Sequence, residues 1–346
     1  MNTGIIGAGR IGRVHIRNIT SSVPQINITA LADPMLNEEI TAFARQHHIP
    51  KVTTDAREIF DDPDIDAVII CSSTNTHAEY IIEAAKAGKH IFCEKPVDYD
   101  LARVREAIDA AENAGVILQI GFCRRFDHNH RAVYDMVRSG SVGDVNLIRI
   151  SSRDPEPPSI DYVKVSGGIF YDMMIHDFDM ARFLAGCEVT EVQAWGSVLV
   201  DPAIGEAGDV DTAAVMLRFE NGAIGMIDNS RQAVYGYDQR VEVFGSRGMA
   251  FNDNDVLHTA RILTADSTCS APMHRVMFDR YTQAFISEMQ SFARALETGT
   301  GPEVNGEDGL PPVLMAAAAT LSMKEHRPVK ISEIIETANV NPVHTA

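Results

Sequence analysis

The sequence has no apolar stretch long enough to cross a membrane, and no leader in which basic residues precede an apolar run. Met1, Asn2 and Thr3 lead directly into an apolar segment that ends in glycines. We therefore expect a protein that is neither exported nor inserted into a membrane. With 346 residues, 45% of them hydrophobic, the chain can bury two cores of ordinary size, so we expect two domains.

Cysteine and clustered positive charge are also scarce. The cysteines are odd in number, scattered and without C-x-x-C spacing: Cys71, Cys93, Cys123, Cys187 and Cys269. We interpret them as buried thiols in a reducing compartment and expect the cytoplasm. The formal net charge is −18 and no basic stripe is present, so neither nucleic acid nor an anionic membrane is an expected partner. The sequence contains no internal repeat and no low-complexity tract.

The N-terminal segment has the pattern of a dinucleotide-binding βαβ unit. An apolar run at residues 3–6 precedes GAGRIG (7–12), a helical pattern follows, and a second apolar run at 26–32 ends at Asp33. In such a unit the first glycine permits a tight turn, the second lets the backbone approach a pyrophosphate, and the third lets the helix pack on the strand. We expect the phosphates to lie at the helix N-terminus.

Asp33 is the predicted ribose ligand. A carboxylate at this position accepts hydrogen bonds from the adenosine ribose and repels a 2′-phosphate, and no arginine directly follows it. This predicts NAD in preference to NADP. The alternative is that Asp33, which precedes Pro34, is only a turn or capping residue. The predicted cofactor contacts in this segment are Gly7, Ala8, Gly9, Arg10, Ile11, Gly12 and Asp33.

Helix and strand patterns continue to alternate as far as residue 121. The helical patterns lie at 37–46, 56–60, 77–87 and 101–114, and the strand patterns at 51–53, 67–71, 90–93 and 116–121. This rhythm predicts a doubly wound parallel sheet, in which ligands lie beyond the C-terminal ends of the strands. One such end carries SSTNTH, whose small polar groups suit a ribose and nicotinamide path or, alternatively, a helix cap. Its predicted cofactor contacts are Ser72, Ser73, Thr74, Asn75 and His77.

Another strand end carries Glu94, Lys95 and Pro96. A lysine at the C-terminal end of a strand, between an acid and a proline that fixes the backbone, is not typical of an exposed surface residue. Together, GIIGAGRIG, Asp33-Pro34, SSTNTH, EKP and GFCRRFD resemble the glucose-fructose oxidoreductase/inositol dehydrogenase family (Gfo/Idh/MocA). The resemblance implies that Lys95 contacts the hydroxyl group being oxidised and that Glu94 lies on the cofactor side.

Beyond residue 122 the strand patterns follow one another with few helices between them, at 146–152, 189–199, 210–219, 223–230 and 240–244. We predict an α/β protein with a Rossmann NAD-binding domain at 1–122, an α+β domain with a large, mostly antiparallel open sheet at 123–335, and a tail at 336–346. Asn221-Gly222 is predicted to form a two-residue hairpin turn, and helices are predicted at 278–297 and 308–324. An open sheet face needs a cover, and the resemblance implies another subunit, so we expect a homo-oligomer, a tetramer by family likeness.

The segment GGIFYDMMIHDFD (167–179) is where we expect the chemistry. If it is helical from Tyr171, Asp172 and His176 share one face, with Asp179 near them. Taken alone, this pattern is typical of a solvated acidic face with a structural histidine. Beside a nicotinamide site it fits hydride transfer, with His176 as the base that removes the hydroxyl proton and Asp172 setting its tautomer.

Lys95 completes this hypothesis by donating to the developing alkoxide. The triplet Lys95, Asp172 and His176 matches the EKP lysine and the D-x-x-x-H motif of the resembled family. Gly167 and Gly168 are predicted to turn the chain into the catalytic helix. Asp177 and Asp179 are assigned to the helix surface or to a position behind the site.

Residues 152–168 resemble the corresponding stretch of inositol 2-dehydrogenases, which implies oxidation of myo-inositol to a keto-inositol with reduction of NAD. The alternative for this stretch is a proline-stiffened surface loop. The predicted substrate contacts are Lys95, Arg125, Arg153, Asp154, Tyr162, Asp172, His176 and Tyr235. Lys164 is a further plausible polar supplier.

Three rival functions stay open. The first is a dehydrogenase of another cyclic polyol or aldose, such as scyllo-inositol, chiro-inositol or glucose. The second is a regulator that senses nicotinamide without turnover, and the intact catalytic triplet argues against it. The third is an NAD-dependent glycosidase, and the inositol-like loop argues against that. The histidines at 47–48 and 128–130 lack a completing cluster of cysteines or carboxylates, so we predict no metal.

Overall fold

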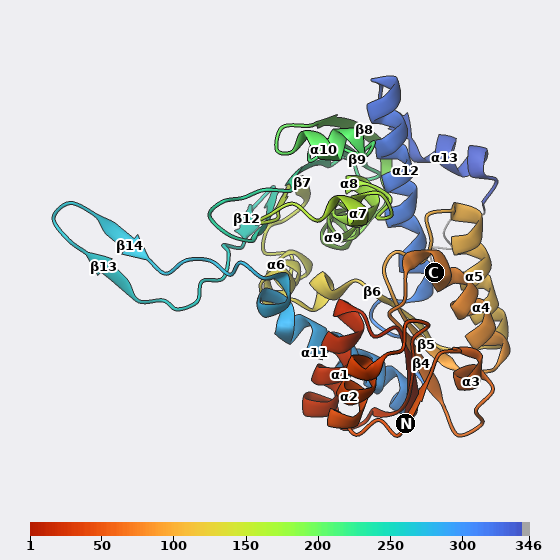
Figure 1. Cartoon of the computed structure of the whole chain (residues 1–346). Helices are drawn as coiled ribbons and strands as arrows, with labels where there is room; N and C mark the ends of the chain where they lie inside the picture. Colours follow the sequence, from red (N-terminus) through yellow and green to blue (C-terminus); the bar gives the residue numbers. More distant parts are fainter. Residues whose placement is uncertain (341–346) are drawn as a thin grey trace. The chain divides into compact units, whose positions relative to one another are not determined.

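A computed structural model describes residues 1–340, and the chain divides into two compact units (Figure 1). The first unit contains Met1–Phe126 and Thr282–Val313, together with the described residues from Ala338 onward. The second contains Asp127–Tyr281 and Leu314–Thr337. The predicted second domain, 123–335, therefore differs from the observed one, because Thr282–Val313 returns to the first unit. No helix among the described residues is long and apolar enough to span a bilayer.

The first unit is built on a six-stranded sheet in the order β3-β2-β1-β4-β5-β6, and every neighbouring pair is parallel. The strands are β1 (Asn2–Ile6), β2 (Asn27–Ala32), β3 (Lys51–Thr53), β4 (Ala67–Ile70), β5 (His90–Glu94) and β6 (Leu118–Gly121). The strand order reverses between β1 and β4, which is where doubly wound sheets bind their ligands. The predicted Rossmann architecture is confirmed.

Helices connect these strands as the alternation predicted. They are α1 (Arg10–Ser22), α2 (Glu38–Gln46), α3 (Arg57–Phe60), α4 (His77–Lys86) and α5 (Leu101–Ala114), with short 3-10 turns η1 (Thr74–Thr76), η2 (Cys123–Phe126) and η3 (Gly306–Gly309). Helix α11 (Met277–Thr298) adds Met289, Phe292, Ala293 and Leu296 to the core formed by β1, β4 and α1. The first unit therefore completes its core with residues from late in the chain.

The second unit contains a seven-stranded sheet in the order β12-β11-β7-β10-β9-β8-β15. The strands are β7 (Val145–Arg153), β8 (Val189–Ser197), β9 (Thr212–Phe219), β10 (Ile224–Ser230), β11 (Asp238–Gly245), β12 (Gly248–Phe251) and β15 (Val329–Lys330). Only the β7–β10 pair is parallel. The prediction of a mostly antiparallel sheet is confirmed.

The helices of the second unit are α6 (His128–Arg138), α7 (Ile160–Val163), α8 (Ile169–Asp172), α9 (Ile175–Ala185), α10 (Pro202–Glu206) and α13 (Ile331–Ala338). Helix α12 (Leu310–Glu325) runs from the first unit into the second. The tail predicted from residue 336 starts inside α13, because the helix continues to Ala338, and its residues 341–346 lie outside the described part of the chain.

Alternation gives the sheet of the second unit one buried face. Along β9, Val215, Leu217 and Phe219 are buried while the intervening side chains point the other way. The β9–β10 turn differs from the predicted two-residue turn. Phe219 pairs with Ala223, and the three residues between them end in Gly222 at φ 86°. A type I turn followed by a left-handed glycine gives this three-residue hairpin.

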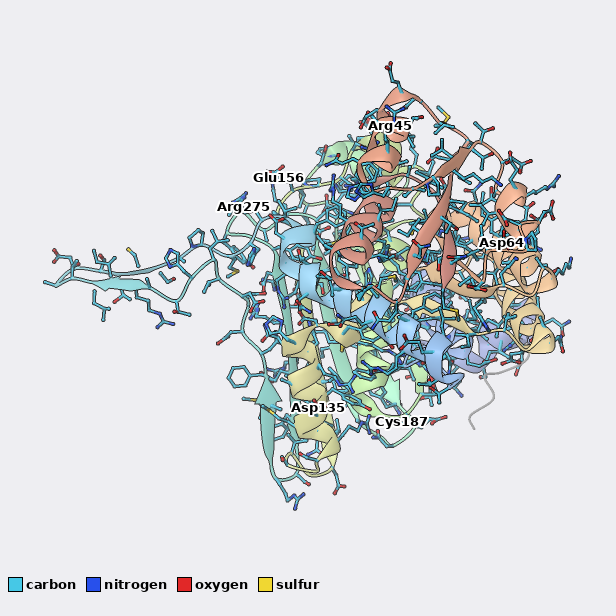
Figure 2. All side chains as sticks on the ribbon, turned by 90° about the horizontal axis from the view of Figure 1, so that it is seen from below. Arg45, Asp64, Asp135, Glu156, Cys187 and Arg275 are labelled. Atoms are coloured by element: carbon cyan, nitrogen blue, oxygen red, sulfur yellow. The ribbon has the colours of Figure 1, made fainter. Side chains whose placement is uncertain are left out.

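A narrow hairpin extends away from the sheet of the second unit (Figure 1). It consists of β13 (Arg261–Leu263) and β14 (Thr268–Ser270), which pair only with each other. At its base, a guanidinium nitrogen of Arg275 lies 3.9 Å from a carboxylate oxygen of Glu156 (Figure 2).

Candidate active site

The three glycines of the turn after β1 differ in the space around them, and only Gly9 has open space where a Cβ would lie. Gly7 has φ 101°, and a Cβ there would lie 2.5 Å from the Cys71 carbonyl oxygen. A Cβ on Gly12 would lie 2.1 Å from the Gly7 carbonyl oxygen, because α1 packs closely on the turn. A Cβ on Gly9, by contrast, would meet no atom within 4 Å. The open side at Gly9, directly before the N-terminus of α1, is shaped for the backbone approach of a pyrophosphate.

Asp33 braces this turn from the end of β2. One carboxylate oxygen accepts the Ala8 backbone N–H at 2.7 Å, and the other accepts that of Met35 at 2.8 Å. Each carboxylate oxygen can accept a second hydrogen bond, so capacity for ribose hydroxyls is left. Asp33 is thus a turn residue in this structure, and its chemistry also fits the predicted ribose contact.

The SSTNTH segment and the EKP segment are tied together by His77. Its Nδ1 lies 2.8 Å from the Pro96 carbonyl oxygen and its Nε2 lies 3.1 Å from that of Ser72, while the Ser72 and Thr76 hydroxyl oxygens are 2.7 Å apart. Burial lowers the pKa of His77, although these two carbonyls act in the opposite direction. His77 therefore joins two strand-end turns, a structural role beside the cofactor contact predicted for it.

Glu94 and Lys95 follow one another at the end of β5, yet their surroundings differ. Glu94 is buried, and its carboxylate lies 2.7 Å from Nε2 of His15 on α1. Gly121 makes room for it, since a Cβ there would lie 3.0 Å from a Glu94 carboxylate oxygen. Lys95 is half-buried, and its bond to Pro96 is cis. The first unit thus carries the cofactor turn and the EKP lysine.

The second unit carries Asp172 and His176, and here the predicted continuous helix is wrong. Helix α8 ends at Asp172 and α9 begins at Ile175. At the junction the Met174 N–H bonds to the Ile169 carbonyl five residues back, and the Asp177 N–H bonds to Met174 only three residues back. This change of hydrogen-bond spacing interrupts the regular helix, so Asp172 and His176 belong to separate short helices.

The entry into α8 follows the prediction for its glycines. Gly167 and Gly168 have φ 81° and 86°, so both adopt the left-handed conformation that glycine tolerates. The Asp209 carboxylate accepts the Ile169 N–H at 3.0 Å, and a Cβ on Gly168 would lie 2.9 Å from that carboxylate. Asp209 therefore holds the start of the helix that carries Asp172.

Two donors fix the Asp172 carboxylate. The Tyr162 hydroxyl donates to one oxygen at 2.7 Å, and Arg231 donates to the other at 2.9 Å. Arg231 is 1% exposed and also donates to Asp209 at 3.5 Å. Burial alone would lower the pKa of Arg231, but the charges of Asp172 and Asp209 raise it, so it stays charged. Sequence reasoning missed Arg231, whose one signal was its position directly after a strand.

Asp177 and Asp179, predicted to lie either on the helix surface or behind the site, are buried. Asp177 accepts the Ser152 hydroxyl at 2.5 Å and the Asn229 amide at 2.8 Å. These donors come from β7 and β10, so they clamp α9 to the sheet. Asp179 is 1% exposed. Of the two predicted alternatives, the helix surface is wrong, because the polar partners of α9 lie on strands far away in the sequence. The other alternative, a position behind the site, stays a prediction.

Other predicted substrate residues lie in ion-pair networks. Arg153 donates to Asp228 and, at 3.0 Å, to the Tyr235 hydroxyl, which itself donates to Asp238. Asp154, next in the chain, pairs through its backbone with Ser230 and Ala233. In the first unit, Arg125 is buried and donates to Asp308 at 2.8 Å. The structure thus brings Arg153 together with Tyr235, and Tyr162 together with Asp172.

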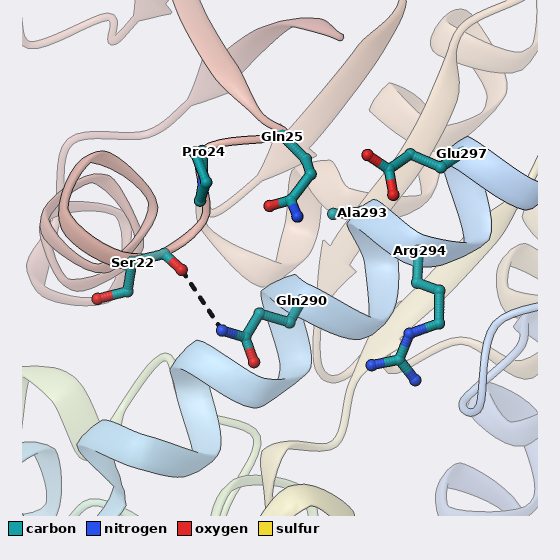
Figure 3. A pocket seen from close by; sticks show the side chains of 7 residues that line it. All are labelled: Ser22, Pro24, Gln25, Gln290, Ala293, Arg294 and Glu297. Carbon is teal, nitrogen blue, oxygen red and sulfur yellow. Dashed lines mark hydrogen bonds between the residues drawn. The ribbon is translucent and has the colours of Figure 1, made fainter.

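One pocket lies at the other end of α1 from the glycine turn (Figure 3). It is lined by Ser22, Pro24, Gln25, Gln290, Ala293, Arg294 and Glu297, and the Gln290 amide donates to the Ser22 carbonyl at 3.4 Å. The thirteen residues of α1 separate it from the turn by roughly 18 Å of helix. This pocket is not the cofactor site.

These features define a nicotinamide-dependent oxidoreductase, with a dinucleotide turn in one unit and a fixed carboxylate before a histidine in the other. Residues 1–122 match the model of the oxidoreductase family with an NAD-binding Rossmann fold, and residues 130–251 match the GFO/IDH/MocA C-terminal domain. The chain belongs to the Gfo/Idh/MocA family, and its cofactor is NAD.

The matches to its relatives extend over nearly all of the chain. It is 47% identical to myo-inositol 2-dehydrogenase of Thermotoga maritima, over 97% of this chain and 100% of the relative. A crystal structure of a probable dehydrogenase from Thermotoga maritima superposes with a TM-score of 0.94 at 46% identity, over 97% of this chain and 100% of that one. The crystal structure of scyllo-inositol dehydrogenase from Lactobacillus casei, with NAD(H) and scyllo-inositol bound, superposes with a TM-score of 0.89 at 29% identity. The match covers 96% of this chain and 99% of that one.

Proposed function

We propose that the protein oxidises one secondary hydroxyl of myo-inositol to a ketone, giving scyllo-inosose, with NAD⁺ as the oxidant. The observation that carries the chemistry is the Asp172 carboxylate, which is held by Tyr162 and Arg231. It is followed four residues later by a histidine. The choice of substrate is supported by the full-length likeness to a protein named myo-inositol 2-dehydrogenase.

When bound, NAD⁺ supplies the hydride acceptor. Gly9 and the first turn of α1 would hold its pyrophosphate, and Asp33 would hold its adenosine ribose. Ser72, Ser73, Thr74 and Asn75 would line the path toward the nicotinamide. The negative charge of Asp33 would repel a 2′-phosphate, which favours NAD over NADP.

Side chains of the protein remove the proton of the substrate hydroxyl group. His176 takes the hydroxyl proton while the C–H electron pair leaves as hydride, so the carbon–oxygen bond becomes double and one alcohol yields one ketone, one NADH and one proton. Lys95 donates a hydrogen bond to the oxygen as its negative charge develops. Asp172, held rigid, favours the imidazolium form of His176 by its charge.

The protein would act in the cytoplasm as a homo-oligomer, a tetramer by family likeness. Its five cysteines are free, which suits a reducing compartment. The outer face of the sheet in the second unit exposes Trp195, Ile224, Phe244 and Phe251, which suits burial against another subunit.

A second candidate is the oxidation of scyllo-inositol. It is favoured by the likeness to the Lactobacillus casei enzyme that holds this isomer. The two isomers differ in the orientation of one hydroxyl, so the same catalytic groups would serve either.

The test is NADH formation by purified protein with NAD⁺ and a panel of myo-inositol, scyllo-inositol, chiro-inositol and glucose. We expect the highest kcat/KM with myo-inositol. His176→Ala should lower kcat at neutral pH by about 100-fold or more and leave the Kd for NADH unchanged. His258→Ala, at an exposed histidine, is the matched control. Absence of turnover with every polyol would refute the proposal, and unchanged kcat in His176→Ala would remove this residue as the base.

A further inference from the structure

Three buried side chains with metal-binding atoms converge inside the first unit. His15 on α1, Glu94 at the end of β5 and Glu288 on α11 each present one such atom, and these atoms all lie within 4.8 Å of one another. His15 and Glu288 are 0% exposed, and Glu94 is 8% exposed. The His15 ring packs edge-on against Phe92 and Phe285, at centroid distances of 5.3 and 5.6 Å. The cluster is therefore shielded from water.

The polar atoms of this cluster are incompletely paired. His15 Nε2 and Glu94 are 2.7 Å apart, but His15 Nδ1 and both carboxylate oxygens of Glu288 have no hydrogen-bond partner among the described residues. A buried carboxylate without a partner is costly, and a second carboxylate beside it adds repulsion. Accordingly, burial and the neighbouring charge of Glu94 raise the pKa of Glu288.

Either a proton or a cation could relieve this repulsion. A proton on Glu288 would remove its charge, but the new hydroxyl would need an acceptor, and the Glu288 carboxylate has no hydrogen-bond partner among the described residues. A divalent cation would satisfy His15, Glu94 and Glu288 at once, and its charge would cancel that of the two carboxylates. One imidazole and two carboxylates suit zinc or another first-row divalent ion.

The spacing is compatible with such an ion. Ligand atoms about 2.1 Å from a tetrahedral ion lie about 3.4 Å apart. The observed spacings, from 2.7 Å up to at most 4.8 Å, bracket that value. We propose that His15, Glu94 and Glu288 form a structural binding site for a first-row divalent cation of the zinc class, which joins α1, β5 and α11. This site could not be predicted from the sequence, because its three ligands lie in three distant segments.

The site is tested by elemental analysis of protein purified without chelators, followed by titration of the chelator-treated protein with Zn²⁺. We expect an equimolar amount of metal, and thermal unfolding that moves to higher temperature as Zn²⁺ is added. Glu288→Gln should weaken Zn²⁺ binding by more than about 100-fold, because it removes a ligand. Glu297→Gln, on an exposed glutamate of the same helix, should leave binding unchanged.

X-ray absorption at the zinc edge of the wild-type protein covers the case in which Glu288→Gln does not fold. We expect a first shell of nitrogen and oxygen only. A shell that contains sulfur would place the metal on the cysteines and overturn the proposal. So would a wild-type protein that neither retains metal nor gains thermal stability from Zn²⁺, since the cluster would then hold a proton.

Discussion

At the scale of single residues, the glycines of the GAGRIG turn can be separated by what surrounds them. Gly9 has ordinary backbone angles and open space on its Cβ side, whereas Gly7 and Gly12 are closed in. A methyl group on Gly9 should therefore leave folding intact but occupy the space into which the pyrophosphate fits. We expect Gly9→Ala to raise the Kd for NADH at least about tenfold, a loss of roughly 1.4 kcal/mol, with an unchanged unfolding temperature.

The measurement is a fluorescence titration with NADH beside a thermal melt. Gly301→Ala is the matched control, because a Cβ there also meets nothing within 4 Å and Gly301 lies outside the turn. Tight NADH binding by Gly9→Ala would contradict the assignment of this space to the cofactor.

Arg231 is the second residue for which the effect of a substitution can be predicted. Its removal would leave Asp172 and Asp209 without their shared cation, and a broken buried ion pair costs about 3–5 kcal/mol. Arg231→Leu should lower the free energy of unfolding by an amount of this order and also lower kcat, because Asp172 loses a fixed partner. The Kd for NADH should stay the same, because Arg231 belongs to the second unit.

Urea unfolding and steady-state kinetics would check these effects. Arg231→Lys should restore part of the stability through its charge, but not the paired contacts of the guanidinium. If Arg231→Leu lost stability but kept wild-type kcat, Arg231 would have a purely structural role.

At the scale of elements, Asp127 joins the start of α6 to α11. Its carboxylate accepts the His130 N–H and two bonds from Arg280, all inside the second unit. Burial alone would raise the pKa of Asp127, but hydrogen bonds from His130 and Arg280 prevail and hold it well below its ordinary value. A carboxylate with a lowered pKa stabilises the fold above its unfolded pKa of about 3.9 and loses that contribution as the pH falls.

We therefore expect wild-type stability to decline progressively below about pH 4. Asp127→Asn should cost about 3–5 kcal/mol at neutral pH, because Arg280 loses its buried partner and keeps only the Asp255 carboxylate, 3.3 Å away. The substitution should also remove part of the acid dependence. Urea unfolding as a function of pH measures both. If the free energy of unfolding of Asp127→Asn fell with decreasing pH in parallel with that of the wild type, other carboxylates would control the acid transition.

The element scale also shows what could be predicted from the sequence. The βα rhythm located every strand of the first sheet, because buried parallel strands are short apolar runs between turn residues, which is a local signal. The junction between α8 and α9 could not be predicted, since hydrogen bonds around Met174 and the Asp209 cap decide it. The sequence also could not predict the partners of Asp172 and Asp177, which are Arg231, Asn229 and Ser152. These residues come close to the two aspartates only because distant strands pair.

At the scale of the whole molecule, the outer face of the second sheet supports the proposed oligomer. Strand register places Trp195 opposite Ala214 and Ile224 opposite Arg218, on the face away from the core. Phe244 and Phe251 are 44% and 55% exposed on the same face. We expect the pair Ile224→Glu and Phe244→Glu to lower the molar mass in solution, because charges would be buried at the subunit contact.

Light scattering after gel filtration measures this mass. Leu199→Glu, at a side chain that is 75% exposed in a loop, is the control and should leave the mass unchanged. A wild-type protein with the mass of one chain would refute the oligomer itself.

The return of Thr282–Val313 to the first unit has a consequence for the order of events during synthesis. Met289, Phe292, Ala293 and Leu296 complete a core that begins with Ile5, so the cofactor unit cannot close when its first 126 residues emerge from the ribosome. It has to wait, with part of its apolar surface uncovered, while the residues of the second unit up to Tyr281 are made. We therefore expect the first 126 residues, although they are translated first, to finish folding only after Thr282–Val313 has been made.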